Sequence, residues 1–336
     1  MGTQPVGEVD QLAYRYGVLV TASGRNLTTY LWDGKQWQMR HRPAPLSSTA
    51  GTSVRSLILD DGFAFVLATE GWYVIALDNV QIRHQRPEPC SFQAKRGTWW
   101  VRIKKGDSPE QSILVIMNCA TWTEIPVVLP VPLADVTDMV MGDVIYVASS
   151  NGDIFVVDPA TGQCDTKELF VPWRRLALQD RRVIMLGSNQ NGQTVLGALA
   201  ENGQMEGPFH HSERLLTDMA VVNDEVYIGG ENQIAQYRAS ILSQKPSVNT
   251  LPQNEQTQKD FIALRDQTGS VRLVLYRKDE QKGHLYLYDP IHGSTTPIGS
   301  LLQKPPQFCM ADKHLVVALR EASTKLNTYV LGEEAK

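Results

Sequence analysis

Apolar and polar positions alternate in short runs along the whole chain, and turn-forming residues separate the runs. The clearest stretch is 143–164, where two alternating runs, 144–148 and 154–157, flank the polar segment SSNGD. Two such runs around a short segment containing Gly are typical of a β-hairpin. The second run ends in DPATG, a sequence with strong turn chemistry, which predicts one more strand at 167–170.

Comparable apolar runs recur from one end of the chain to the other, at intervals of roughly 36 to 45 residues. They lie at 18–20, 63–67, 99–103, 144–147, 183–186, 226–228, 271–276 and 315–319. This period is the one expected of four-stranded propeller blades, and eight units would average about 42 residues each. The pattern predicts an all-β fold, a single closed β-propeller of eight blades with four antiparallel strands each; seven blades is the alternative.

We therefore expect a single domain over residues 1–336. Its approximate blades are 10–43, 53–88, 91–130, 134–171, 173–210, 214–248, 259–299 and 306–332, the last completed by 1–9. The final unit has room for only three strands, so an N-terminal strand within 3–9 would close the ring and remove an open sheet edge. Pro5 is compatible with this position because an outermost strand leaves one side unpaired.

Two further features of the pattern concern turns and loops. Asp33, Asp78, Asp158 and Asp289 each follow an apolar run and would begin the hairpin between third and fourth strands, where Asp accepts backbone N–H bonds two residues on. The segment 243–259 is polar and without periodicity. It is either a solvated loop, which we favour, or a binding loop.

The stretch VIYVASSNGDIFVVDPATGQ at 144–163 resembles the repeat of the PQQ-like, or quinoprotein-type, β-propeller family, and GHLYLYDPIHG at 283–293 resembles it in part. The resemblance implies the propeller architecture. Enzymes of that family carry two adjacent cysteines beside their quinone cofactor, and no two cysteines are adjacent here. The chain is therefore closer to the non-catalytic branch, whose members present rims and faces to other proteins, and we expect no cofactor.

Composition narrows the class of protein. The formal net charge is −4, so no overall basic field would attract the chain to nucleic acid. Cys90, Cys119, Cys164 and Cys309 are far apart and form no CxxC pair, which indicates buried thiols rather than a metal or redox site. The N-terminus has no signal-peptide pattern and no run is long enough to cross a membrane, so we expect a soluble, cytoplasmic protein.

The most suggestive chemistry is basic and lies where predicted blades end. Arg40, His41 and Arg42 end the first unit, and Arg83, His84 and Arg86 end the second. His41 and His84 are one repeat apart, so they should occupy equivalent sites on neighbouring blades. Arg binds carboxylates well, and the clusters are candidates for docking an acidic partner protein. Charged residues are also ordinary on solvated outer strands, and both interpretations stay open.

A second candidate site lies at the link between the fourth and fifth units. Trp173 follows Pro172 and precedes Arg174 and Arg175, and Trp and Arg are enriched at binding hot spots. We expect Trp173 to be exposed there.

The sequence thus predicts a non-catalytic propeller scaffold that binds one or more proteins within a multiprotein assembly. The rival hypothesis is a propeller enzyme or carbohydrate-binding protein acting at the central funnel. An enzyme should show convergent acidic or His side chains around the channel. A scaffold should instead show apolar or Arg-rich surface on a face or rim.

Overall fold

The computed structural model describes residues 2–5, 9–47, 49, 51–200, 202–210, 218–229, 233–250, 256–265, 271–278, 282–302, 307–311, 314–319 and 325–330. Nearly all of the regular structure in this part of the chain is β-strand. The exceptions are two single-turn 3₁₀ helices, η1 (Leu133–Asp135) and η2 (Ala239–Ile241).

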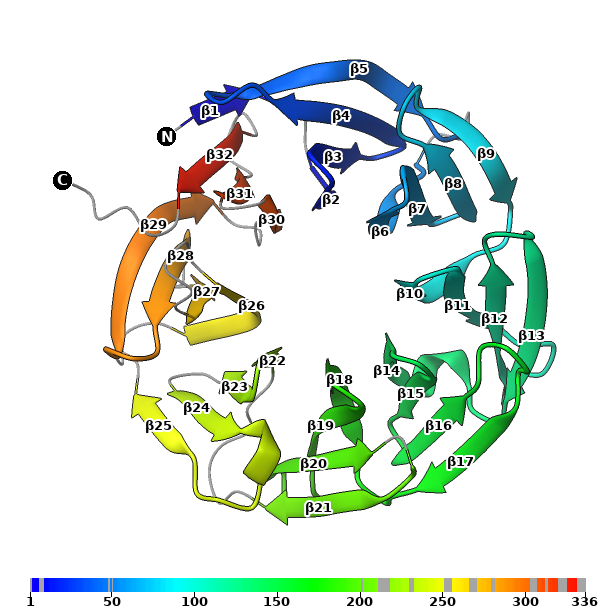
Figure 1. Ribbon diagram of the computed structural model, residues 1–336, viewed down its shortest axis with the longest axis vertical. Helices are drawn as coiled ribbons and strands as arrows, with labels where there is room; N and C mark the ends of the chain where they lie inside the picture. Colours follow the sequence, from blue (N-terminus) through cyan, green and yellow to red (C-terminus); the bar gives the residue numbers. More distant parts are fainter. Residues whose placement is uncertain are drawn as a thin grey trace.

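The described strands form eight four-stranded sheets, which stand as blades around a common centre (Figure 1). From the innermost strand outward, blade 1 is β2 (Gln11–Arg15), β3 (Val18–Ser23), β4 (Asn26–Trp32) and β5 (Trp37–Pro45); blade 2 is β6 (Val54–Asp60), β7 (Phe63–Ala68), β8 (Trp72–Ala76) and β9 (Gln81–Arg86); blade 3 is β10 (Cys90–Arg96), β11 (Trp99–Lys105), β12 (Ser112–Asn118) and β13 (Thr123–Leu129); blade 4 is β14 (Val136–Met141), β15 (Ile145–Ser149), β16 (Asp153–Val157) and β17 (Cys164–Glu168).

The second half of the ring repeats this arrangement. Blade 5 is β18 (Trp173–Gln179), β19 (Arg182–Ser188), β20 (Thr194–Ala200) and β21 (Met205–His210); blade 6 is β22 (Asp218–Val222), β23 (Glu225–Gly229), β24 (Gln233–Arg238) and β25 (Ser247–Thr250); blade 7 is β26 (Gln256–Arg265), β27 (Val271–Lys278), β28 (Lys282–Asp289) and β29 (Ser294–Leu302); blade 8 is β30 (Gln307–Ala311), β31 (His314–Leu319), β32 (Lys325–Val330) and β1 (Gly2–Pro5).

The N-terminal strand closes the ring, as the sequence predicted. β1 pairs antiparallel with β32, from Gly2 opposite Thr328 to Pro5 opposite Lys325, and it is the outermost strand of blade 8. Trp37 of blade 1 adds a buried bond across the same closure, because its Nε1 donates to Oγ1 of Thr328 at 3.1 Å. The two ends of the chain are therefore joined by strand pairing within blade 8 and by a hydrogen bond between blades 8 and 1.

Each of the eight predicted apolar runs coincides with the second strand of its blade, although the run 144–147 begins one residue before β15. These strands are β3, β7, β11, β15, β19, β23, β27 and β31. The strand expected at 167–170 differs: β17 begins at Cys164 and ends at Glu168. Pairing resumes directly after the DPATG turn, with Cys164 opposite Val157, so the strand ends earlier and leaves the residues after it to the link between blades.

The predicted Asp turns are present at three of the four positions. Oδ1 of Asp33 accepts the backbone N–H of Lys35 at 2.8 Å. Oδ1 of Asp158 likewise accepts that of Ala160 at 2.7 Å, and Oδ1 of Asp289 that of Ile291 at 2.9 Å. In the turn containing Asp78 the bond is made instead by Asn79, whose Oδ1 accepts Gln81 N–H at 3.1 Å.

The polar segment 243–259 is not one continuous loop. It contains β25, which pairs with β24 as the outer strand of blade 6, and the first residues of β26. Residues 251–255 lie outside the described part. Periodicity was a poor guide here because an outer strand is solvated and needs no apolar face.

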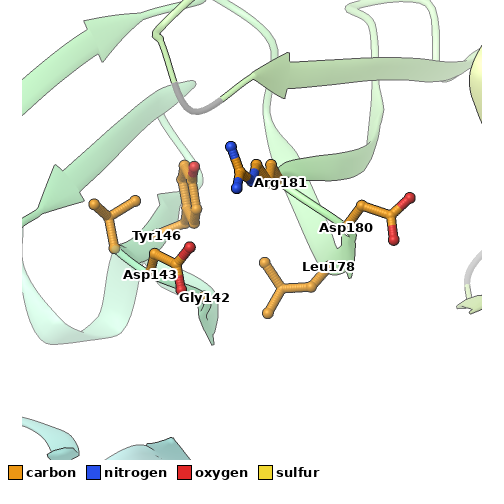
Figure 2. Close-up of a pocket in the computed structure, with 7 residues that line it drawn as sticks. Gly142, Asp143, Tyr146, Leu178, Asp180 and Arg181 are labelled. Carbon is orange, nitrogen blue, oxygen red and sulfur yellow. The ribbon is translucent and has the colours of Figure 1, made fainter.

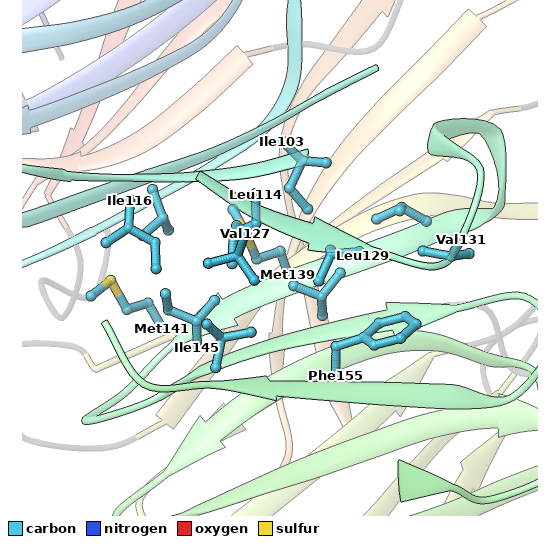
Figure 3. Packing of buried hydrophobic residues seen from close by; sticks show 14 residues of the cluster. Ile103, Leu114, Ile116, Val127, Leu129, Val131, Met139, Met141, Ile145 and Phe155 are labelled. Carbon is cyan, nitrogen blue, oxygen red and sulfur yellow. The ribbon is translucent and has the colours of Figure 1, made fainter. Parts of the chain in front are cut away.

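The hydrophobic core lies in the seams between blades rather than within any blade. The seam between blades 3 and 4 shows this best: β11, β12 and β13 face β14, β15 and β16, and their aliphatic side chains interdigitate (Figure 3). Comparable buried clusters join blades 1 and 2, 2 and 3, 4 and 5, 5 and 6, 6 and 7, and 8 and 1. Middle strands can consequently be buried on both faces, as the burial of β8 and β15 throughout shows.

The seam between blades 2 and 3 contains a buried cation. Arg102 on β11 is fully buried, and its guanidinium lies 4.3 Å from the ring centroid of Trp72 and 4.7 Å from that of Trp100. Its Nη2 pairs with Glu124, which Arg86 also contacts at 2.6 Å. Desolvated cation–π contacts of this kind are stronger than exposed ones, so Arg102 holds the two tryptophans together across the seam.

Arg102→Ala should lower the free energy of unfolding by about 3–5 kcal/mol, because it opens a space beside the two indole rings and removes a cation from Glu124. Arg102→Met fills the space and should lose clearly less. Urea denaturation of the purified protein measures both. Arg181→Ala, at an exposed position, is the control and should change stability by at most about 0.5 kcal/mol. An Arg102→Ala protein as stable as that control would contradict the role assigned to this seam.

Candidate protein-interaction surface

The outermost strands of blades 1 and 2 carry the same irregularity at the same position. In β5 the pairing with β4 skips Arg40, and in β9 the pairing with β8 skips Arg83, so each is the extra residue of a β-bulge. The next residues, His41 and His84, resume the pairing. The predicted equivalence of the two histidines is therefore confirmed by the register, and the bulge turns both arginines outward, where they are exposed.

An exposed apolar residue precedes each of these arginines. Met39 is 51% exposed and Ile82 is 38% exposed, and Leu31 on the neighbouring strand β4 is 39% exposed. We call Leu31, Met39, Arg40, Ile82 and Arg83 the rim patch. Because β5 and β9 follow each other around the outside of the ring (Figure 1), the patch presents one apolar–Arg pair on each of two adjacent blades.

The two histidines do not belong to this exposed surface. Nδ1 of His41 lies 2.9 Å from Oγ1 of Thr29, within its own blade. The ring of His84 stacks on Trp122 of blade 3, with 3.8 Å between ring centroids and 27° between planes. Both histidines therefore support the packing of β5 and β9.

The remaining basic candidates of these strands differ in their surroundings. Arg86 is engaged by Glu124 and lies 5.8 Å from the ring centroid of Trp72, so it covers the seam between blades 2 and 3. Arg42 lies in β5, but its side chain is outside the described part of the structure. Of the basic residues in β9, Arg83 is therefore the candidate for contact with a partner protein, since Arg86 pairs with Glu124 and His84 stacks on Trp122.

The prediction that Trp173 is exposed is wrong. Trp173 has 0% exposure and packs in the seam between blades 4 and 5. Space for its ring is provided by two glycines, Gly187 and Gly197: an added Cβ at either would lie 3.0 Å from the indole. Its backbone carbonyl accepts a bond from Oγ1 of Thr137 at 2.6 Å, which fixes the start of β18. Trp173 therefore stabilises the fold and does not touch a partner.

The two arginines after Trp173 have different surroundings. Pairing between β18 and β19 skips Arg174, so it is a bulge residue and is exposed, whereas Nε of Arg175 pairs with Oδ1 of Asp218 on blade 6 at 3.4 Å. Arg174 is the member of the trio that remains available at the surface.

The aromatic side chain exposed in this region is Phe170, which the sequence analysis had placed inside a strand. Phe170 is 82% exposed and has φ of 55°. A bulky residue held in this left-handed region carries strain of about 1–3 kcal/mol. The apolar run containing Phe170 concealed it, because apolar residues before a Pro look like the end of a buried strand.

The hairpin around Asp60 joins three blades. Its carboxylate accepts Arg15 of blade 1 at 2.9 Å and Lys95 of blade 3 at 2.8 Å, and both Asp60 and Lys95 are buried. Asp61 follows with φ of 46° and occupies the turn. The Asp60 carboxylate therefore links the blades across their seams, and Asp61 belongs to the turn.

The described residues contain no group of three or more His, Cys, Asp or Glu side chains that could hold a metal ion. An indentation between blades 4 and 5, lined by Tyr146, Leu178 and Arg181 among others (Figure 2), has a volume of about 10 Å³, which is the space of one water molecule.

Burial raises the pKa of Cys90 to about 11 and that of Cys309 to about 12, which keeps both thiols protonated at neutral pH.

Comparisons with known proteins show which solved structures share this fold. No protein-family model matches the chain, and no curated protein matches its sequence. Among solved structures, Sqt1 of Saccharomyces cerevisiae is similar at 12% identity and a TM-score of 0.69, covering 99% of this chain and 98% of that one. BamB from Moraxella catarrhalis is similar at 10% identity and a TM-score of 0.67, covering 100% and 98%.

A third similar structure is BBS1N, solved in complex with ARL6DN, at 14% identity and a TM-score of 0.53, covering 100% of this chain and 97% of that one. The TM-scores and coverages show a shared fold, and the chain is accordingly a β-propeller protein. In the described part of the chain, neither short helix is long or apolar enough to cross a membrane.

Trp173→Ala should lower the free energy of unfolding by about 3–5 kcal/mol, because it empties a fully buried site between two blades. Arg174→Ala, at the next residue, should change it by at most about 0.5 kcal/mol, because the side chain is solvated. Chemical denaturation of the two variants measures the contrast. Equal stabilities would mean that Trp173 is not packed as described.

Proposed function

We propose that this protein is a non-catalytic β-propeller scaffold that binds partner proteins within a multiprotein assembly, and that the rim patch docks an acidic segment of one partner. The observation that carries the proposal is the repetition of an exposed apolar–Arg pair, at the same register, on adjacent blades. Repetition at one register gives two similar contacts side by side, which suits an extended segment lying across β5 and β9.

The chemistry of the rim patch determines the kind of partner. Guanidinium groups form forked bonds with carboxylates, and the side chains of Met39 and Ile82 offer apolar area beside them. A segment with Asp or Glu residues interspersed with apolar ones is complementary to this arrangement. Rim charges mainly raise association rates and are screened by salt, so binding should weaken as ionic strength rises.

The structural comparisons support a protein-binding role without identifying the partner. BBS1N, one of the similar propellers, was solved in complex with ARL6DN. As part of the proposal, we take the resemblance of 144–163 to PQQ-like repeats as a likeness to the non-catalytic branch. We also place the protein in the reducing cytoplasm, because all four cysteines are unpaired.

Replacing both exposed arginines, Arg40→Glu with Arg83→Glu, should weaken partner binding at least about tenfold, equivalent to about 1.4 kcal/mol. The reason is that the patch then repels the carboxylates that it attracted. Quantitative affinity purification from the source cells, followed by titration of the captured protein, measures the loss. Circular dichroism should show unchanged β structure, because both side chains are exposed.

The control is Arg181→Glu, which makes one Arg-to-Glu charge reversal at an exposed position outside the rim patch. It should retain wild-type capture. Undiminished capture by the double variant, or an equal loss with Arg181→Glu, would rule out the rim patch as the docking surface.

A further inference from the structure

We infer that Phe170 is the anchor of a second docking site, which inserts into an apolar pocket of a partner protein bordered by carboxylates. Phe170 lies in the link between β17 and β18. In blade 4, the link to the next blade and the hairpin between second and third strands share one face of the ring. The first hairpin of blade 1, which contains Tyr16, is on the opposite face, because the strands of each blade alternate in direction.

The backbone of Phe170 is unusual among the described residues. The other non-Gly residues with positive φ belong to tight turns inside blades, where the turn itself requires that conformation. They are Tyr16, Asp61, Asp180 and Asn223 in first hairpins, and Val80 and Trp122 in turns between third and fourth strands. Phe170 is the described case that lies between blades, so no hairpin accounts for its strain. Such strain persists only where the surroundings impose it, and it is a recognised mark of binding sites.

The surroundings of Phe170 do impose it. Gly152, in the hairpin of blade 4, has φ of 101°, and a Cβ there would lie 2.7 Å from the backbone N of Val171 and 3.0 Å from Cα of Phe170. The N–H of Leu169 donates to the carbonyl of Gly152 at 3.2 Å, and the carbonyl of Pro172 accepts the N–H of Ser188 at 3.3 Å. The link is thus fixed on both sides of Phe170, and its ring is held outward.

The exposed Arg174 indicates which charge the partner's pocket should carry at its border. Arg174, four residues further on in the sequence, is the exposed residue at the bulge of β18, while Arg175 pairs with Asp218. Aromatic and Arg side chains are both enriched at protein interfaces. A partner that accepts both offers an apolar pocket for the ring and Asp or Glu at its border for Arg174. This site is independent of the rim patch, so either can fail without the other.

Photo-crosslinking tests the site directly. p-Benzoylphenylalanine is incorporated at position 170 and, as a matched control, at position 16. Tyr16 resembles Phe170 in being exposed (69%) and in having a positive φ, but it lies on the opposite face of the ring. After irradiation in the source cells, mass spectrometry identifies the products. We expect one protein other than this chain to be crosslinked from position 170 and not from position 16, through a peptide with apolar residues next to Asp or Glu.

Titration of that protein completes the test. Phe170→Ala and Arg174→Glu should each weaken binding at least tenfold, whereas Tyr16→Ala should not. Phe170→Gly should lose binding equally while keeping or raising the melting temperature, because Gly adopts positive φ without strain. Crosslinks absent, equal from both positions, or only to lipid or a second copy of this chain would overturn the proposal. So would wild-type affinity in Phe170→Ala, or a melting temperature of Phe170→Gly lowered by more than about 3 °C.

Discussion

The whole structure depends on the burial of each blade against both of its neighbours. A four-stranded sheet has two faces and no core of its own, so its apolar side chains are removed from water only when another blade packs on each side. The seams supply this, from the aliphatic packing of blades 3 and 4 to the cluster of Trp72, Trp100 and Arg102 between blades 2 and 3. Inner and middle strands are consequently constrained, whereas a fourth strand such as β9 faces the solvent.

Such packing also requires the ring to be closed, because an open ring would expose two blade faces and one sheet edge. Closure here joins the two ends of the chain through β1 and β32 and through the bond from Trp37 to Thr328. Ion pairs reinforce the seams: Asp60 holds both Arg15 and Lys95, so that blades 1, 2 and 3 are linked through one carboxylate.

Surface chemistry arises where the strand pairing within a blade is locally irregular. A bulge places Arg40 and Arg83 outside the rim while their neighbours stay in register, and a bulge in β18 separates exposed Arg174 from buried Trp173. An extra residue shifts the alternation of a strand by one position, which transfers side chains from one face to the other. The rim patch and the site around Phe170 both owe their exposed side chains to departures from regular geometry, and the regular parts of the blades hold them rigidly.

The sequence by itself determined the architecture. Alternating apolar runs at a fixed period, with Asp-containing turns, specify the second strand of every blade and most hairpins, because these patterns depend on local backbone chemistry. It also indicated that Arg40 and Arg83 end equivalent units. Only the tertiary structure decided that Phe170 rather than Trp173 faces water, and that Glu124 engages Arg86. Those outcomes depend on bulges and on space left across a seam, such as that beside Gly187 and Gly197, and contacts between distant segments are not written in the local pattern of either one.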